Sequence, residues 1–168
     1  MRGECVITNA RTAEICKLTE NSFRDVNIAF ANELIRLANR HPRVNILQPG
    51  PGLGPGVGGH CIAVDPWFIV SKTPEEARLI RTAREVNDSK PEWVINKVKQ
   101  AVAEYLMKNP DKTAKDVTIA SFGLAFKPDI DDLRESPALA VTQQIAADHP
   151  GVVLAVEPNI KARLTPDA

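Results

Sequence analysis

Chemistry could be carried by a cysteine that directly follows a glycine-rich loop. Cys61 ends the run Gly58-Gly59-His60-Cys61, and Asp65 stands four residues further on. A thiol beside a backbone with few side chains can be reached by a substrate, and backbone N–H groups there can stabilise an oxyanion. A buried cysteine that packs as a small apolar side chain is the more common situation for this residue type, so both interpretations stay open.

His60 suggests another reading, a Cys–His pair of the kind that hydrolases use. A base must lie within hydrogen-bond reach of its nucleophile, and adjacent side chains usually point apart, so His60 is a weak candidate. The glycines do not form a P-loop, because no Gly-Lys-Ser or Gly-Lys-Thr follows them.

A second group consists of Lys17 and Asn21, which lie four residues apart on the polar face of a predicted helix. Their side chains are therefore neighbours. An ammonium beside an amide can stabilise negative charge that develops on a reacting oxygen. A solvated helix face gives the same pattern without any function.

A third group is the charged loop that contains Phe126-Lys127-Pro128 and residues 131–137. It lies between a predicted strand and a predicted helix, where parallel α/β sheets bind their ligands. Lys127 and Arg134 have the charge that a diphosphate requires. A charged surface loop followed by a Ser-Pro helix start would look the same.

The composition indicates a soluble globular chain rather than a partner of nucleic acid or membranes. The 168 residues are 43% apolar, and Lys+Arg and Asp+Glu both number 21. No apolar run approaches the ~20 residues that span a bilayer, and the N-terminus lacks the layout of a signal peptide. The three cysteines form no C-x-x-C pair, so neither a metal site nor a disulfide framework is predicted. We expect a cytoplasmic protein with reduced thiols.

The first element that must position these residues is a long helix. Apolar residues at three- and four-residue steps, among them Phe30 and Leu37, predict a helix over residues 11–39. Thr12 and Glu14 are expected to open it, and it should stop before Pro42. A short apolar run at residues 5–8 could be a strand.

A glycine-rich loop and a second helical stretch follow. Six of the nine glycines lie between residues 50 and 59, interleaved with prolines, which predicts a loop over residues 48–61. Thr73 is predicted to cap a helix that runs through Val86. Pro91 should either kink this helix or begin a new one in its first turn.

The period changes beyond residue 110 and predicts a parallel strand–helix–strand unit. Its parts are a strand over residues 117–122, a turn at Gly123, a helix from Ser136 to about residue 147, and a strand over residues 152–156. A boundary near residues 111–116 would divide the chain into domains at 1–115 and 116–168.

Three motifs occur in a fixed order along the chain. They are Ala13-Glu14-x-x-Lys17-Leu18-x-x-Asn21 with Phe30-Ala31-Asn32-Glu33, then Gly58-Gly59-His60-Cys61-Ile62-x-x-Asp65-Pro66, then Gly123-Leu124-Ala125-Phe126-Lys127-Pro128 with Asp131-Asp132-x-Arg134-Glu135-Ser136-Pro137. In this order they resemble the UDP-glucose/GDP-mannose dehydrogenase family, and the likeness covers about residues 12–160. Within the family, residues 16–25 and 41–48 resemble the branch whose substrate is UDP-N-acetyl-D-mannosamine.

The resemblance implies an α+β/α fold. A mainly helical central dimerisation domain, similar to the C-terminal domain of 6-phosphogluconate dehydrogenase, would be followed by a partial Rossmann-like α/β domain. NAD would be the cofactor, a UDP-sugar the substrate, and a homodimer would form through the first helix. Members of the family oxidise the C6 alcohol of a nucleotide sugar to a carboxylate, with the aldehyde held by a cysteine as a thiohemiacetal and then a thioester.

The resemblance also implies roles for single residues. Cys61 would be the nucleophile, Lys17 and Asn21 would stabilise the oxyanion, and Asp65 would order or deprotonate water. The substrate would be contacted by Lys127, Phe126, Arg43, Gly58 and Gly59. Arg134 would lie towards the nicotinamide cofactor, and Arg43 would reach the substrate of a neighbouring subunit.

The chain departs from the family pattern in several places. The G-x-G-x-x-G fingerprint of dinucleotide-binding domains is expected to be absent from the whole chain, so the family's cofactor domain would lie before Cys5. Residues 34–40 run directly into residues 41–42, where the family has a longer passage, as if a segment were deleted. Residues 51–55 look like a repeated Pro-Gly element, and the α/β domain ends after about one unit. We therefore expect no turnover by this chain alone. The alternative function is a non-catalytic dimerisation or sugar-nucleotide-binding module.

Overall fold

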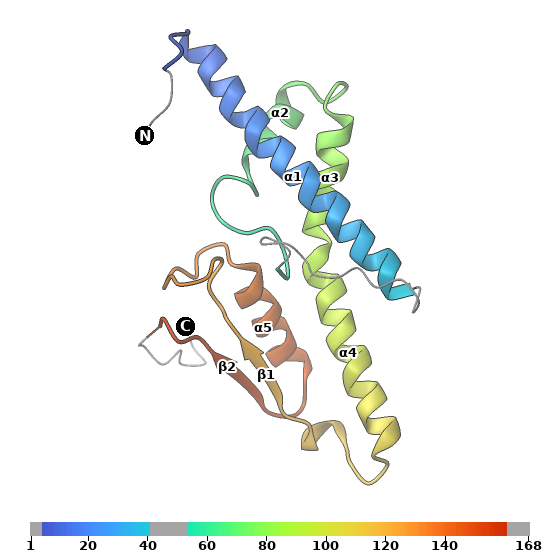
Figure 1. Ribbon diagram of the computed structural model, residues 1–168. Coiled ribbons are helices and arrows are strands. Elements are labelled where there is room, and N and C mark those ends of the chain that lie inside the picture. The colour runs from blue at the N-terminus through green and yellow to red at the C-terminus, as the bar shows by residue number, and fades with distance from the viewer. Residues whose placement is uncertain (1–4, 41–53, 161–168) are drawn as a thin grey trace. The chain divides into compact units, whose positions relative to one another are not determined.

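The computed structural model describes residues 5–40 and 54–160, and it divides into two compact units (Figure 1). The first, here called the helical unit, comprises Met1–Pro49 and His60–Asn87. The second, here called the α/β unit, comprises Gly50–Gly59 and Asp88–Ala168. The domain boundary expected near residues 111–116 stays a prediction.

The longest element of the helical unit is α1 (Ala10–Arg40), which confirms the helix predicted over residues 11–39. Its first turn is capped by Asn9, and not by Thr12 or Glu14 as predicted. Asn9 Oδ1 accepts hydrogen bonds from the Thr12 N–H at 2.9 Å and from the Thr12 hydroxyl at 3.1 Å.

The buried face of α1 differs from the apolar face that the sequence suggests. Phe30 and Leu37 were expected to pack inward, but they are 62% and 53% exposed. The buried positions of α1 are mostly polar: Asn21, Ser22, Asp25, Ala29 and Asn32. A polar network therefore takes the place of an ordinary apolar contact between helices.

Two shorter helices complete the helical unit, α2 (Asp65–Lys72) and α3 (Arg78–Asp88). The prediction that Thr73 begins a helix is wrong, because Thr73 ends α2. Its N–H and its hydroxyl donate to the Ile69 carbonyl at 2.9 Å and 3.0 Å. α2 packs against α1, and residues 5–9 form no strand.

The first helix of the α/β unit is α4 (Lys90–Lys108), which has Pro91 in its first turn. Of the two alternatives predicted for Pro91, a kink or the start of a new helix, the second is therefore confirmed. After the short 3₁₀ helix η1 (Ala114–Asp116) come β1 (Ile119–Phe122), α5 (Pro137–Asp148) and β2 (Val153–Val156). The two strands pair in parallel, with Ile119 opposite Val153. This order confirms the predicted strand–helix–strand unit.

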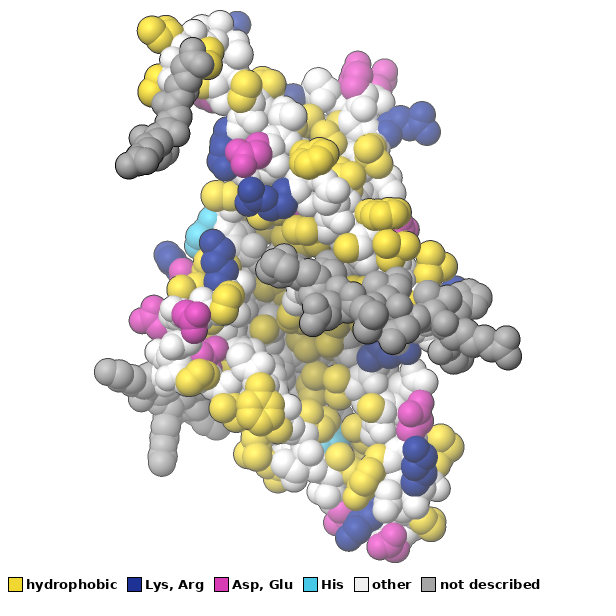
Figure 2. Space-filling view, in the orientation of Figure 1, with side chains coloured by type: hydrophobic (Ala, Val, Ile, Leu, Met, Phe, Trp, Pro, Cys, Tyr) yellow, Lys and Arg dark blue, Asp and Glu magenta, His cyan; other side chains and the backbone are white. Residues whose placement is uncertain are grey.

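Helix α5 covers one face of the two-stranded sheet. Ser121 of β1 and Thr142 of α5 share a hydrogen bond of 2.6 Å between their hydroxyls. Alternate side chains point to the other face. There Phe122, Leu154 and Val156 are 78%, 50% and 40% exposed. Apolar side chains thus reach the surface of the α/β unit, and Figure 2 shows them at the surface of both units. None of the described helices is long and apolar enough to cross a bilayer.

Candidate active site

Three polar side chains of the helical unit form a chain of hydrogen bonds. Lys17 Nζ donates to Asn21 Oδ1 at 3.2 Å, and Asn21 Nδ2 donates to Asp65 Oδ2 at 2.5 Å. Lys17 and Asn21 lie one turn apart on α1, and Asp65 is the first residue of α2. Both ends of the Asn21 amide are therefore fixed, and Asn21 is only 1% exposed. The structure brings together three of the four residues for which the resemblance implies catalytic roles.

The turn that carries Cys61 is joined directly to this hydrogen-bonded chain. The Cys61 carbonyl accepts hydrogen bonds from the N–H of Val64 at 3.1 Å and of Asp65 at 2.7 Å, so Asp65 follows Cys61 by one turn. Cys61 is exposed and in no disulfide, so the interpretation of Cys61 as a buried apolar residue is wrong. An accessible thiol can attack an electrophilic carbon, and a nearby ammonium can stabilise the oxygen anion that results.

A buried ion pair between α1 and α3 contacts the same turn. Arg84 Nη1 donates to Asp25 Oδ1 at 2.6 Å, and the two side chains are 1% and 0% exposed. The same nitrogen lies 3.5 Å from the carbonyl oxygen of Ile62, the residue after Cys61. The ion pair therefore links the core of the helical unit to the Cys61 turn.

Two buried asparagines extend this network. Asn87 Nδ2 donates to the Asp25 carboxylate at 2.8 Å and to the Asp25 carbonyl at 3.0 Å. Asn32 Nδ2 donates to Asn87 Oδ1 at 2.9 Å. This network was not predicted from the sequence. The signal was present in the polar residues Asn21, Asp25 and Asn32, which recur at four- and seven-residue steps on one face of α1.

In the α/β unit, the loop between β1 and α5 is held at both ends. Gly123, with φ of +83°, turns the chain out of β1, a conformation that favours glycine. The N–H groups of Leu124 and Ala125 donate to Glu157 Oε2 at 2.8 Å and 3.1 Å. At the far end, the Ser136 hydroxyl donates to the Leu124 carbonyl at 2.6 Å. Ser136 also caps α5, as predicted, by accepting the Leu139 N–H at 3.4 Å.

Glu157 directly follows β2 and bonds to this loop, but it was not among the site residues predicted from the sequence. Hydrogen bonds from backbone N–H groups, first that of Leu124, lower the pKa of Glu157 below its ordinary value. Because the pKa of Glu157 is lower in the folded state, its ionised carboxylate stabilises the α/β unit at pH values above the ordinary pKa of a glutamate. That contribution is lost as the pH falls through the lowered pKa.

The predicted substrate residues of the α/β unit gather around Phe126. Lys127 Nζ lies 5.4 Å from the centre of the Phe126 ring. Gly59, with φ of +87°, lies so close to the Phe126 ring that a Cβ at this position would be 3.1 Å from a ring carbon. Its N–H donates to the Glu135 carbonyl at 3.4 Å. A Cβ on Gly58 would lie 2.6 Å from the same carbonyl, so both glycines permit a close backbone approach.

Arg134, which the resemblance places near the cofactor, is engaged by its own loop. Its Nε and Nη2 donate to the two Asp132 oxygens at 2.9 Å and 2.7 Å, and this contact raises the pKa of Arg134. The expectation that no G-x-G-x-x-G occurs in the chain is wrong, because residues 54–59 have this spacing. A Cβ on Gly56 or Gly58, however, would meet the Pro137 ring within 2.7 Å. A proline therefore fills the space beside these glycines that a pyrophosphate would need, so residues 54–59 do not form a dinucleotide-binding loop. Arg43 lies outside the described residues.

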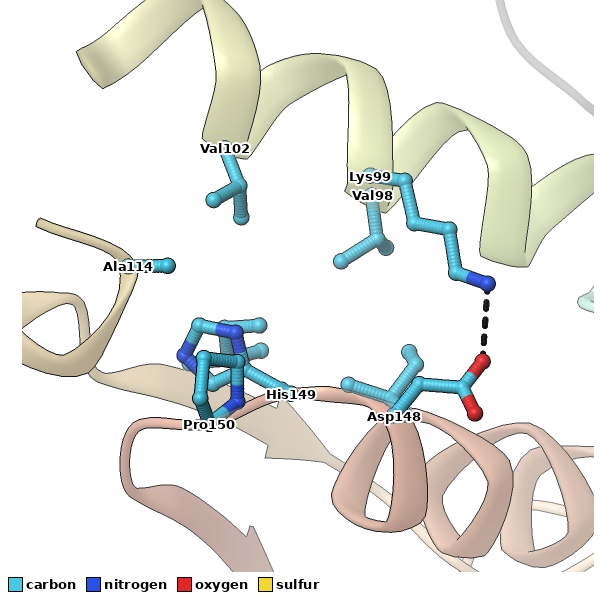
Figure 3. A pocket seen from close by; sticks show the side chains of 9 residues that line it. Val98, Lys99, Val102, Ala114, Asp148, His149 and Pro150 are labelled. Carbon is cyan, nitrogen blue, oxygen red and sulfur yellow. Dashed lines mark hydrogen bonds and ion pairs between the residues drawn. The ribbon is translucent and has the colours of Figure 1, made fainter.

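The α/β unit also contains a cavity that the sequence did not predict (Figure 3). It measures about 160 Å³ and lies among α4, α5 and β1. Apolar side chains such as Val98, Val102 and Ile145 line it, and Lys99 and Asp148 pair across one side at 2.7 Å. A His149 ring nitrogen is 2.7 Å from the Val117 carbonyl. Each of these three polar side chains thus has a hydrogen-bond partner, and the residues that line the cavity carry no thiol or hydroxyl.

Two family models match the chain. The central-domain model of the UDP-glucose/GDP-mannose dehydrogenase family matches residues 11–46 and 33–89, and the UDP-binding-domain model of that family matches residues 120–166. The chain therefore belongs to the UDP-glucose/GDP-mannose dehydrogenase family, as its three motifs indicate.

Relatives within the family are dehydrogenases of N-acetylated sugars. A UDP-N-acetyl-D-mannosamine dehydrogenase of Salmonella typhi is 67% identical over 96% of this chain and 40% of its own length. An NDP-N-acetyl-D-galactosaminuronic acid dehydrogenase of Ralstonia nicotianae is 59% identical over 96% of this chain and 38% of its own. A solved UDP-N-acetyl-mannosamine dehydrogenase, Cap5O from Staphylococcus aureus, superposes with a TM-score of 0.68 at 44% identity, covering 96% of this chain and 39% of that one. The chain spans about two fifths of the length of these relatives.

The comparisons also bear on the shortened passage near residues 34–40. The alignment with the Salmonella typhi relative runs over 175 positions, more than the 168 residues of this chain, so the relative has residues that this chain lacks. The central-domain model matches in two overlapping segments that meet at residues 33–46. Helix α1 runs on to Arg40 through this region. The position of those residues is not given by the alignment length, so the deletion expected near residues 34–40 stays a prediction.

Proposed function

We propose that this chain is the cysteine-bearing part of an NAD-dependent UDP-sugar 6-dehydrogenase. The substrate is UDP-N-acetyl-D-mannosamine, and the product is the corresponding uronate. This proposal is carried by the hydrogen-bonded chain of Lys17, Asn21 and Asp65, in which Asp65 follows the exposed residue Cys61 by one turn. The alternative function, a non-catalytic dimerisation or sugar-nucleotide-binding fragment, does not need this arrangement.

In this proposal each residue of the helical unit has one task. The Cys61 sulfur adds to the C6 aldehyde, and the thiohemiacetal oxygen that forms carries the developing negative charge. The Lys17 ammonium donates one N–H to Asn21 and has further N–H groups. One of these stabilises the thiohemiacetal oxygen. Asp65, held by Asn21, orders the water that later hydrolyses the thioester and releases the thiol.

The oxidation of the alcohol to the carboxylate would be supplied by two NAD molecules, each of which takes up one hydride in the family reaction. Because residues 54–59 do not form a dinucleotide-binding loop and the chain spans about two fifths of its relatives' length, we propose that NAD is bound by polypeptide other than this chain. The sugar is assigned from the relatives, whose names include two different N-acetylated hexosamine derivatives. In its broader form, the proposal is that the substrate is a UDP-linked N-acetylhexosamine.

The nucleotide part of the proposal is tested by titration calorimetry of the chain with UDP-N-acetyl-D-mannosamine. We expect saturable binding, weakened at least about tenfold in Lys127→Ala because the lysine pairs with a diphosphate. Lys115→Ala, which removes an exposed lysine of η1, should bind like the unchanged chain. Absence of binding by the folded chain would contradict the proposal.

We further propose that the chain forms a homodimer through α1. Four large apolar side chains, Ile15, Phe23, Phe30 and Leu37, are 53–71% exposed along one side of this helix, the last three at seven-residue steps. Phe23→Ser combined with Phe30→Ser should convert a dimer to a monomer in sedimentation equilibrium. Leu79→Ser, which alters an exposed leucine of α3, should leave the dimer intact. A monomer from the unchanged chain would rule this interface out.

A further inference from the structure

Glu157 lies where the two parallel strands end, beside the loop that carries Lys127. The Gly123 N–H donates to the Val156 carbonyl at 2.8 Å, which extends the pairing of β1 and β2 by one bond. Both strands therefore present their carboxyl ends at one edge of the sheet (Figure 1). Ligands of such sheets bind at this edge.

The Glu157 carboxylate accepts hydrogen bonds from residues that follow both strands. Oε2 accepts the N–H groups of Leu124 and Ala125 at 2.8 Å and 3.1 Å, whereas Oε1 accepts the Asn159 N–H at 3.1 Å and its side-chain amide at 3.3 Å. Bonds from N–H groups to a charged acceptor are stronger than neutral ones. One side chain thus ties the start of the β1–α5 loop to the segment after β2.

The same bonds restrict the backbone just before Lys127. Both polar groups of Leu124 are engaged, since its N–H reaches Glu157 and its carbonyl accepts the buried Ser136 hydroxyl. Leu124 itself is 2% exposed. The backbone conformation of Leu124 and Ala125 is therefore restricted, and Phe126 and Lys127 are the next two residues.

We propose that Glu157 is a positioning residue for diphosphate binding by Lys127. This inference rests on the proposed function of the α/β unit and adds a residue to it. Glu157 touches no ligand in this account. Its carboxylate occupies the two loop N–H groups that could otherwise meet a phosphate, and it fixes the loop so that the diphosphate is met by the lysine.

The test is a double-mutant cycle for UDP binding by the full chain. Glu157→Met removes both acceptor oxygens and keeps the length of the side chain. We expect it to weaken UDP binding at least about tenfold, and to have little effect in a Lys127→Ala background, because the two residues act through one contact. Binding of uridine, which lacks the diphosphate, should change far less than binding of UDP. A general loss of structure would weaken both ligands and would add to the effect of Lys127→Ala.

Two further variants separate the possible outcomes. Glu157→Gln restores one acceptor oxygen and should recover part of the UDP affinity, which keeps the test decisive if Glu157→Met does not fold. Asn159→Ala removes only a donor to Oε1 and should leave UDP binding unchanged. Tighter UDP binding in Glu157→Met, or additive effects of the two mutations, would overturn the inference. Failure of Lys127→Ala to weaken UDP binding would instead overturn the proposed function of the loop.

Discussion

Arg84→Met is expected to lower the free energy of unfolding of the helical unit by about 3–5 kcal/mol. The substitution keeps most of the side-chain volume but removes the guanidinium that pairs with Asp25 at 2.6 Å. Asp25 is 0% exposed, so its carboxylate would remain buried without the guanidinium of Arg84, although the Asn87 amide would still donate to it. An uncompensated buried charge is among the most destabilising changes a core can undergo.

The measurement is a urea titration followed by the fluorescence of Trp67, which lies in α2 of the helical unit. Because Trp93 lies in α4, a Trp93→Phe background confines the signal to the helical unit. Arg78→Met is the matched control, since it removes an exposed arginine of the same helix and should change the free energy by less than about 0.5 kcal/mol.

The pairing itself is tested by removing both charges. Asp25→Leu combined with Arg84→Met leaves no buried charge of this pair, so it should recover at least half of the loss seen in Arg84→Met. If Arg84→Met alone costs less than about 1 kcal/mol, the buried pair contributes no more to stability than a surface ion pair does.

The elements that the sequence predicted well are those with strong local signals. The helix over residues 11–39 has a long run of helix-forming residues, and it agrees with α1 to within one residue at each end. Ser136-Pro137 places a capping hydroxyl before a proline, and α5 begins there. The two strands were recognised as short apolar runs on either side of this helix. In each case the deciding interactions lie within a few residues.

The errors and omissions involve partners that are distant in sequence. Thr73 has the residue type of a helix start, but its hydroxyl bonds backward to Ile69, which sequence alone does not reveal. Arg84 and Asp25 are 59 residues apart, and Leu124 and Glu157 are 33 apart. A charged residue in a sequence is ordinarily read as exposed, so a buried pair becomes visible only when the fold brings the partners together.

The candidate site was predictable to a similar degree. Lys17 and Asn21 were paired from their spacing, and the structure shows that hydrogen bond. The bond from Asn21 to Asp65 joins two helices and could not be derived from spacing. The roles of these residues came from the resemblance, and they remain proposals.

Cys61→Ser is expected to abolish covalent capture of the substrate aldehyde. If Cys61 is the nucleophile, the chain should convert part of a UDP-N-acetyl-D-mannosamine 6-aldehyde, labelled with ¹³C at C6, into a thiohemiacetal. Formation of this adduct joins sulfur to C6 and moves one proton to the former carbonyl oxygen, so it needs no NAD. Carbon NMR distinguishes its C6 resonance from those of the free aldehyde and the hydrate.

Cys16→Ser is the matched control, because Cys16 is also an exposed free thiol and lies next to Lys17. The adduct resonance should persist in Cys16→Ser and vanish in Cys61→Ser. Only Cys61 stands one turn before Asp65, whose bond to Asn21 connects it to the ammonium that would stabilise the adduct oxygen. An adduct that survives Cys61→Ser would remove this thiol from the reaction. Absence of any adduct in the unchanged chain would favour the non-catalytic alternative, because the thiol would then be accessible without being reactive.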